Sequence, residues 1–524
     1  RNDLAMLCGD GVSVVLQNAD GTMARPIKYF SSAQRLRQVN IADLDGDGRN
    51  DLAILTVERD RPLSVRFQSS AGQLGPEVQL ELSPPTVMLP CTLPGAKKAC
   101  LVSVAAQSGR VGACALAPDT RKAAYPVFNY PMPMGEETEN RDLVAADVNG
   151  DGLLDVVATD PAQAEFLLFL ANAKTLLGAS KSFPGLMDMR KLCVARLAGE
   201  KADALVALSI REKIVGLSRF ADGRLSFPET VSLDGEPLAM DVADLDGDGS
   251  PDLAYVVKQK NEDKYALRTV LGIGRKDAKA GPTCELADLK DKPTDIRCGD
   301  VDHDGRADVL VLRPYDPVLL VRQPEAGKFE PVVRRDVQSG LLANVFPTML
   351  TMAPLAKGKP AVLLAQKSFA RALAFDAAKG WQVADQYESA DPRANLAAAT
   401  AGKLTPDAGS PAIVAYDAAR GRVGILTEQE DKTYRTSDEI EVGQLTVKKV
   451  VVGPFGGETP TSILLCGAQK LVLIPVAAKT SVLREACSYE PADNARYGEL
   501  AVGDVNGDNQ PDFVVADQGR GIIE

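Results

Sequence analysis

Histidine and aromatic side chains are scarce in this 524-residue chain, which has one His, one Trp and 5% aromatic residues in total. A single imidazole, His303, has no second His with which to build a metal site, and it is a poor basis for a Ser-His-Asp arrangement. Few aromatic rings also argue against broad stacking platforms for sugars or single-stranded nucleic acid. We therefore expect no histidine-based catalysis and no nucleic-acid partner.

Long apolar runs are also missing. The segment AEFLLFLANA, residues 164–173, falls well short of the roughly 18 apolar residues that span a bilayer. We predict no membrane span. Hydrophobic residues at 45% and charged residues at 25% are nevertheless typical of a folded protein with a substantial core.

The nine cysteines contain no CxxC pair, which argues against a zinc site. Cys91 and Cys100 bracket a short loop, so a disulfide there is one hypothesis and two buried thiols are the other. Further local pairs are Cys284 with Cys298 and Cys466 with Cys487, leaving Cys8, Cys114 and Cys193.

One phrase occurs five times along the chain. Each copy is a short apolar run, an Asp/Gly-rich loop and a second apolar run rich in Val, Leu and Ala, which predicts strand, tight loop, strand. The copies span residues 39–55, 143–159, 239–257, 297–312 and 500–516.

Degenerate copies, which keep the flanking strands but lose the Asp residues, fill the gaps between these five. Together the units have anchors near residues 43, 91, 147, 195, 244, 300, 352, 401, 453 and 504. Their spacing of about 51 residues suits four short strands, which is one propeller blade. We therefore predict an all-β protein, a β-propeller of about ten four-stranded blades over residues 1–524. A seven- or eight-bladed ring with extra blades, or two rings, is the alternative.

The opening RNDLAMLC resembles the second strand of a unit, and the first residue is Arg. We therefore expect the sequence to begin mid-blade and to lack an N-terminal portion such as a signal peptide.

The five loops follow the pattern D-x-[DN]-x-D-G-x-x-D, with Asn in place of the Gly in the fifth. Alternate side chains of a tightly curled loop can direct oxygens at one cation, and Ca²⁺ prefers six to eight oxygen ligands. The residue at position seven would contribute its backbone carbonyl. The candidate ligands of the five loops are Asp43, Asp45, Asp47, Arg49 and Asp51; Asp147, Asn149, Asp151, Leu153 and Asp155; Asp244, Asp246, Asp248, Ser250 and Asp252; Asp300, Asp302, Asp304, Arg306 and Asp308; and Asp504, Asn506, Asp508, Gln510 and Asp512.

The net charge of −12 is concentrated in these loops. Without their eighteen Asp residues the chain would carry +6, and five Ca²⁺ ions would bring the whole protein to −2. A polar turn without metal is the simpler reading of one such loop, but five copies in register favour calcium. An EF-hand is a poorer match, because position twelve is never Glu and a strand, not a helix, is expected to follow.

These phrases resemble the FG-GAP/VCBS repeats of integrin α-subunit propellers and of many secreted bacterial proteins. The resemblance implies calcium held near the inner strands, and a propeller that binds partners or supports attached modules.

We therefore expect a secreted, cell-surface or periplasmic scaffold that binds protein partners as part of a larger assembly or surface complex, and that is not an enzyme. Two alternatives remain: a carbohydrate-binding protein or calcium-dependent polysaccharide-active enzyme, and the propeller part of a larger enzyme.

Overall fold

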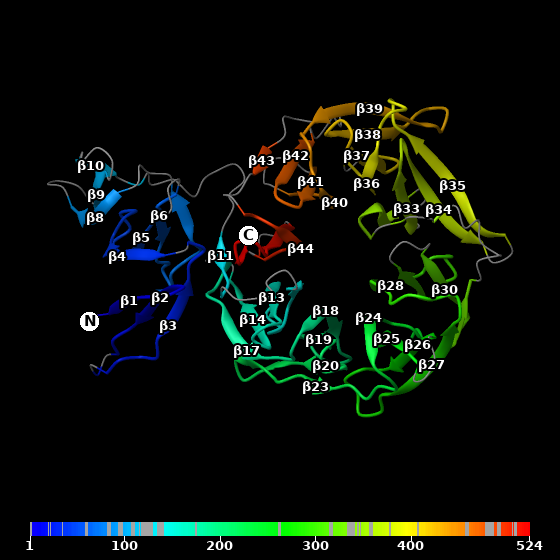
Figure 1. Ribbon diagram of the computed structural model, residues 1–524, viewed down its shortest axis with the longest axis horizontal. Coiled ribbons are helices and arrows are strands. Elements are labelled where there is room, and N and C mark those ends of the chain that lie inside the picture. Colours follow the sequence, from blue (N-terminus) through cyan, green and yellow to red (C-terminus); the bar gives the residue numbers. More distant parts are fainter. Residues whose placement is uncertain are drawn as a thin grey trace.

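The computed structural model consists of antiparallel β-sheets arranged as a ring with a smaller stack beside it (Figure 1). Within the described residues, the helical element is the 3-10 turn η3 (Pro347–Met349), and no helix there is long and apolar enough to cross a membrane. The structure describes residues 3–18, 20, 22–33, 35–57, 61–80, 85–92, 98–105, 111–114, 116, 129–133, 141–172, 176–259, 264–313, 318–332, 341–342, 345, 347–355, 360–376, 379–405, 408–455, 461–476, 487–489, 494–505, 507 and 511–524.

Eight four-stranded sheets form the ring, and we number these ring blades along the chain. From the innermost strand outward they are blade 1, β12 (Leu143–Ala146), β13 (Asp155–Asp160), β14 (Glu165–Phe169) and β17 (Lys181–Pro184); blade 2, β18 (Met189–Arg196), β19 (Asp203–Ser209), β20 (Ile214–Ser218) and β23 (Glu229–Thr230); blade 3, β24 (Pro237–Ala243), β25 (Asp252–Lys258), β26 (Tyr265–Leu271) and β27 (Lys279–Leu286); blade 4, β28 (Asp295–Gly299), β29 (Asp308–Leu312), β30 (Leu319–Glu325) and β31 (Lys328–Pro331); blade 5, β32 (Leu350–Pro354), β33 (Pro360–Gln366), β34 (Phe369–Asp376) and β35 (Gly380–Glu388); blade 6, β36 (Leu396–Gly402), β37 (Ala412–Asp417), β38 (Arg422–Glu428) and β39 (Tyr434–Glu441); blade 7, β40 (Val447–Gly453), β41 (Thr461–Gly467), β42 (Leu471–Val476) and β43 (Cys487–Tyr489); and blade 8, β44 (Tyr497–Gly503), β45 (Asp512–Asp517), β46 (Ile522–Ile523) and β11 (Tyr130–Pro131). Two short strand pairs accompany the ring blades, β15 (Ala171–Asn172) with β16 (Leu176–Leu177) and β21 (Phe220–Ala221) with β22 (Arg224–Leu225).

The second strand of a blade is an apolar run because both of its faces are covered by neighbouring blades. In β13, β19 and β41 every residue is buried. Such strands lose the polar alternation that marks a sheet with one face in water. One apolar cluster fills each of the eight spaces between consecutive blades. The core is therefore a circle of blade interfaces and not a single centre.

The ring closes by a strand from outside its own sequence. Tyr130 and Pro131 in β11 pair with Ile523 and Ile522 in β46. Residues that precede the first ring blade thus form the outer strand of the last one. This pairing ties two segments separated by almost 400 residues of chain, and it places Tyr130 in the same apolar cluster as Val156 and Ile523.

Three further sheets form an N-terminal stack beside the ring (Figure 1). Apolar clusters join the first to the second and the second to the third. Buried Glu77 ties the stack together and to the ring, since its carboxylate accepts from Ser31 Oγ at 2.7 Å and its backbone bridges Asn129. The sheets are β1 (Leu4–Cys8), β2 (Gly11–Val15) and β3 (Ile27–Phe30); β4 (Leu36–Ala42), β5 (Asp51–Thr56), β6 (Leu63–Arg66) and β7 (Val78–Leu80); and β8 (Pro85–Cys91), β9 (Cys100–Ala105) and β10 (Val111–Cys114).

The structure confirms the predicted all-β propeller of four-stranded blades. The blades do not form one ring of about ten. Eight blades lie in the ring and three sheets lie outside it, which corresponds to the alternative of an eight-bladed ring with extra blades. Of the predicted anchors, 43, 147, 244, 300 and 504 fall in the connection between the first and second strands of a sheet, and 91 and 453 are the last residues of a first strand. The anchors 195, 352 and 401 lie within the first strand.

The suggested disulfides are not formed: Cys91, Cys100, Cys284, Cys298 and Cys466 are free thiols. Cys91 and Cys100 are opposite each other in β8 and β9, but the Cys100 thiol donates to the Cys91 carbonyl oxygen at 3.1 Å. Cys284 lies on the outermost strand of blade 3 and Cys298 on the innermost strand of blade 4. Cys466 is on β41, separated from β43 by β42.

Candidate metal loops and the central channel

Each predicted calcium loop joins the innermost strand of a sheet to its second strand. Loop one (residues 43–51) lies in the second sheet of the stack, between β4 and β5. Loops two (147–155), three (244–252), four (300–308) and five (504–512) lie in ring blades 1, 3, 4 and 8. Four of the predicted sites are therefore on the ring, and one is outside it. In loop five, Asn506, Asp508 and Gln510 lie outside the described residues.

The first Asp of each loop curls the backbone around its own carboxylate. In loop one, Asp43 accepts from the N–H groups of Gly46 and Gly48 at 2.7 and 2.9 Å. Asp244 in loop three makes the same pair of contacts. Gly46 and Gly48 have φ of 88° and 84°, a region that side chains with a Cβ rarely enter. In loop four His303 adopts this conformation at position four, with φ of 62°.

The Asp at position nine has a role that its spacing alone did not reveal. In loop four, Asp308 is fully buried and accepts from the N–H groups of Val301 at 3.0 Å and Gln323 at 2.8 Å. Asp155 repeats this arrangement in loop two. Burial raises the pKa of both carboxyls to about 6. Position nine therefore fastens the loop to the end of the third strand, whether or not it also contacts an ion.

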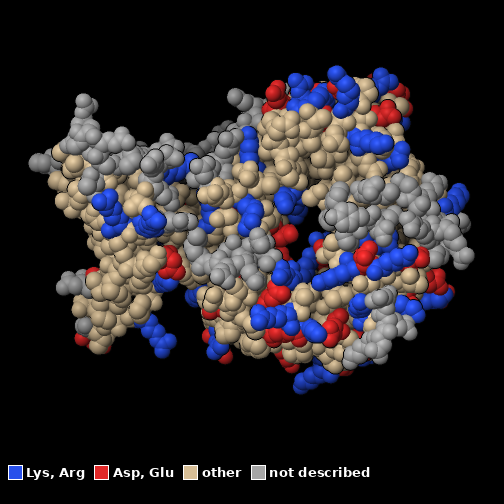
Figure 2. All heavy atoms as spheres, in the orientation of Figure 1, with Lys and Arg blue, Asp and Glu red and all other residues tan. Residues whose placement is uncertain are grey.

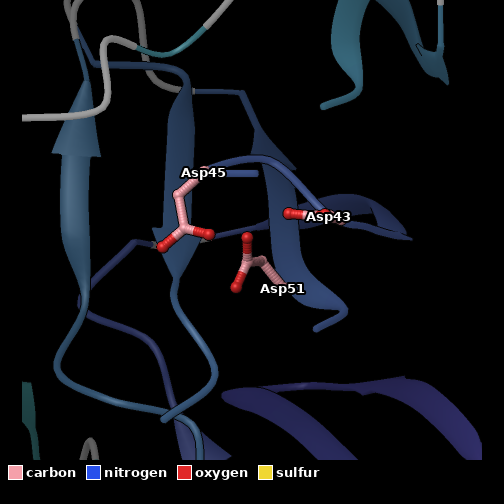
Figure 3. Close-up of side chains that lie close together, drawn as sticks. All are labelled: Asp43, Asp45 and Asp51. Atoms are coloured by element: carbon pink, nitrogen blue, oxygen red, sulfur yellow. The ribbon is translucent and has the colours of Figure 1, made fainter. Parts of the chain in front are cut away.

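Carboxylates converge in three of the loops. Within each of three sets, one oxygen per residue lies within 4.8 Å of the others. In loop one the carboxylates of Asp45 and Asp51 face each other beside Asp43 (Figure 3). Such spacing fits a single hard cation. The sets are Asp43, Asp45 and Asp51; Asp244, Asp246 and Asp248; and Asp300, Asp302 and Asp304.

Other predicted ligands lie outside these sets. In loop one Asp47 is not a member, and in loops three and four the members do not include Asp252 or Asp308. In loop two the amide nitrogen of Asn149 donates to Asp151 at 2.9 Å. This loop has an Asn where the three sets have Asp, so its carboxylates number one fewer.

Asp302 carries the strongest indication of a cation. Its side chain is only 5% exposed. Arg322 donates to Oδ2 from Nε at 2.8 Å, whereas the buried Oδ1 has no hydrogen-bond partner. A buried carboxylate oxygen without a partner is costly, and a coordinated ion would satisfy it. The residues present therefore fit calcium best in loop four.

Arginine side chains neutralise several of the loop carboxylates, which the sequence analysis missed. Arg49 and Arg306, expected to offer only a backbone carbonyl, form ion pairs with Asp47 and Asp304 two residues earlier. In loop three, Arg275 reaches Asp248 at 2.8 Å from beyond the loop. In loops one and four the residue at position seven is Arg, and this was the signal in the sequence from which the ion pairs could have been predicted. These guanidinium groups lower the repulsion among the carboxylates when no ion is bound.

Replacing Asp302 with Asn should remove one calcium ion from the loaded protein. The amide keeps the size of the side chain but weakens both the ion contact and the pair with Arg322. Elemental analysis of the dialysed protein is expected to give one calcium fewer than the wild type. The matched control is Asp222→Asn, at an exposed Asp outside the loops, which should lose none. An unchanged calcium content in Asp302→Asn would contradict the assignment.

A second polar cluster lies where the innermost strands line the central channel, and Figure 2 shows charged side chains of both signs around this opening. Asp241 on β24 accepts from the Cys298 N–H at 2.8 Å and lies 3.8 Å from the Cys193 thiol. Lys191 pairs with Asp295 at 3.3 Å across blades 2 and 4. Burial raises the pKa of the Cys193 thiol, so it stays protonated. The cluster links neighbouring innermost strands, and nothing in it resembles an activated nucleophile.

Asp142, at the start of β12, should give the fold a measurable pH dependence. Burial, with a smaller contribution from Glu499, raises its pKa to about 6. In the unfolded chain the pKa of an Asp carboxyl is about 3.9, so the folded protein binds this proton more tightly than the unfolded chain does. The free energy of unfolding therefore falls as the pH rises from about 4 to about 6. The loss is on the order of 3 kcal/mol.

The measurement is the urea midpoint between pH 4.5 and 7.5 in the presence of chelator, for the wild type and for Asp142→Asn. The variant should lose this part of the slope, whereas Asp222→Asn should keep it. Parallel slopes in the wild type and Asp142→Asn would contradict the assignment.

Comparison of the sequence with protein-family models and with curated proteins finds no match. Among solved structures, two crystal structures of BBS1N in complex with ARL6DN, one soaked with lead and one with mercury, are similar to this chain. Each has 13% identity and a TM-score of 0.40, and the match covers 70% of this chain and 97% of the other.

Proposed function

We propose that this chain is a calcium-binding β-propeller of the FG-GAP/VCBS type that acts as a protein-binding scaffold, not as an enzyme. The observation that carries the calcium assignment is the unpartnered, buried Oδ1 of Asp302 within a set of three converging carboxylates. The same loop pattern recurs five times, always between the first and second strands of a sheet. Shared placement and shared chemistry support one cation role for all five.

The scaffold part of the proposal is supported by the architecture. Eight blades held by eight apolar interfaces make a rigid ring with broad faces formed by loops. Rigid scaffolds that present loops are well suited to binding other proteins. In the channel, Lys191 pairs with Asp295 and Asp241 accepts from the Cys298 N–H, so these side chains link neighbouring innermost strands.

An extracellular, cell-surface or periplasmic location is part of this proposal. Loops of this kind bind Ca²⁺ usefully where its concentration is high, and extracellular calcium modules work at Kd values of about 10⁻⁴ to 10⁻³ M.

The test of the calcium role is the number of ions bound. Equilibrium dialysis against Ca²⁺, followed by elemental analysis, should give about five ions per chain, with loop two or loop five the weakest because each contains Asn at position three. Magnesium at the same concentration should bind poorly, since it requires a smaller octahedral site. A protein that retains no calcium would overturn the proposal.

A further inference from the structure

The first sheet of the N-terminal stack corresponds to strands two to four of a blade. Residues 1–8, RNDLAMLC, match residues 49–56, RNDLAILT, so β1 is the counterpart of β5. In the next sheet β5 is the second strand and lies between β4 and β6. Within the described residues, however, β1 pairs only with β2. The first sheet therefore has an open edge at the place where β4 covers β5.

The contacts of Asp3 match those of an Asp at position nine of a loop. Asp3 accepts from the Gln17 N–H at 2.8 Å, just as Asp51 accepts from the Gln68 N–H at 2.8 Å. Asp51 also accepts from the N–H of Leu44, at position two of its loop, and is 1% exposed. Asp3 is exposed, and no loop N–H reaches it from the described part of the chain. Asp3 thus makes the contact with the third strand and lacks the contact with a loop.

The open edge of β1 presents backbone groups that can pair. Thr56, the counterpart of Cys8, donates its N–H to the Pro62 carbonyl on the β6 side. Alternate residues of an antiparallel strand bond to the same neighbour, so in β1 the N–H and C=O groups of Ala5 and Leu7 face the open edge. The strand, LAMLC, contains no charged residue and no Pro, which are common means of blocking an exposed edge. This edge is therefore suited to strand addition.

The other sheets show what kind of segment fits this edge. In the second sheet, β4 pairs with β5 along its length and leads directly into loop one. Every first strand that the structure describes, from β4 to β44, is already paired within its own sheet. The described residues of this chain, or of a second copy, therefore offer no spare first strand. A strand for the open edge has to come from a different polypeptide.

We propose that β1 accepts a strand from a partner polypeptide of the same repeat type, in which an apolar strand leads into an Asp/Gly-rich loop. The donated strand pairs with β1 in the antiparallel sense, and the N–H at position two of its loop donates to Asp3. Asp3 then serves as position nine of a sixth calcium loop whose other ligands the partner supplies. The strand pairing stands on the geometry of β1, whereas the sixth calcium ion rests on the proposed calcium role of the loops.

The probe is a fluorescein-labelled peptide with the sequence of residues 36–48, LRQVNIADLDGDG, which contains β4 and most of loop one. Fluorescence anisotropy with the calcium-loaded full chain should show saturable binding, with Kd on the order of 1 to 100 μM. A second peptide has proline in place of Asn40, which pairs with Ala53 in the second sheet. This peptide lacks one backbone donor and should bind at least about tenfold more weakly. No saturation at about 1 mM protein, or equal binding of the two peptides, would overturn the proposal.

Asp3→Asn tests the position of the donated loop. The amide oxygen can still accept from Gln17, but it is a weaker ligand for calcium than a carboxylate. With the wild type, the peptide complex should contain one calcium ion more than the free protein, and chelation should weaken peptide binding. With Asp3→Asn, the additional ion should be lost. The matched control is Asp10→Asn, in the turn after β1, which should retain the ion. Retention of the ion by both variants would overturn the role of Asp3.

Ala5→Pro tests the edge itself, because proline removes an N–H that faces the donated strand. Peptide binding should weaken at least about tenfold, and the thermal midpoint of the same sample shows whether the variant is folded. A folded Ala5→Pro variant that binds the peptide with wild-type affinity would overturn the assignment of the site.

The strand site and the calcium assignment can fail separately. If the wild type binds about five calcium ions but no peptide, the strand site is wrong and the calcium role of the five loops stands. If it binds the peptide but no calcium, the strand site stands and both the sixth loop and the proposed calcium role are wrong.

Discussion

Chelation of calcium is expected to lower the thermal midpoint of the loaded protein by roughly 10 °C. At a calcium concentration about a hundredfold above Kd, each independent site contributes about 2.7 kcal/mol, so five sites contribute about 13 kcal/mol. The entropy of unfolding for a chain of this size, about 2 cal/mol/K per residue, converts this into the expected shift.

The structure explains why loss of the ion should reach beyond the loops. In loops one to four the Asp at position nine connects the loop to the end of the third strand, as Asp308 does through Gln323. Without an ion, the remaining carboxylates repel one another, and only some are matched by Arg. Loosening the loop should therefore also loosen the blade that it connects.

Differential scanning calorimetry with calcium, with magnesium and with chelator is the measurement. Magnesium serves as the control and should restore little of the thermal midpoint lost on chelation. The loops suit more ligands at longer metal–oxygen distances than Mg²⁺ prefers. An unchanged midpoint on chelation, together with no bound calcium, would leave the loops as Asp-rich turns.

The second large effect is expected at the closure of the ring. Arg520 forms ion pairs with Asp517, at 2.6 Å from Nε, and with Glu524. The side chains of Asp517 and Glu524 are both fully buried. Replacing Arg520 with Met should destabilise the protein by about 3 to 5 kcal/mol, because it leaves two buried carboxylates without their cation.

The effect should be concentrated in blade 8. Tyr497 also donates to Glu524, at 2.5 Å, so the same network holds β44 and the end of the chain together. Hydrogen exchange should therefore accelerate in β44 to β46 before it does in blade 4.

A matched control uses a surface pair of the same type. Arg393 is 89% exposed and lies 3.3 Å from Asp391. Arg393→Met should change stability by less than about 1 kcal/mol, measured by urea denaturation. Equal midpoints for Arg520→Met and Arg393→Met would show that the buried network does not hold the ring closed.

Much of the site could be predicted because its information is local. The spacing of Asp43, Asp45 and Asp51 specifies a loop whose side chains converge, and Gly46 and Gly48 supply the positive φ that the curl requires. A local sequence pattern does not show which distant residue will contact one of its side chains. Arg322 lies twenty residues beyond Asp302, and the pairing leaves Oδ1 of that Asp free for an ion.

By itself, the sequence determined the strands, the repeat and the position of the loops, since buried strands need continuous apolar runs and tight loops need Gly and Asp. Only the tertiary structure decided how many blades share one ring. A blade looks the same in sequence whether its neighbour belongs to the ring or to the stack, because both cover it with apolar side chains. The closing pair, Tyr130 with Ile523, carries no local signal: it forms because an edge strand must find a partner and the ring brings one to it.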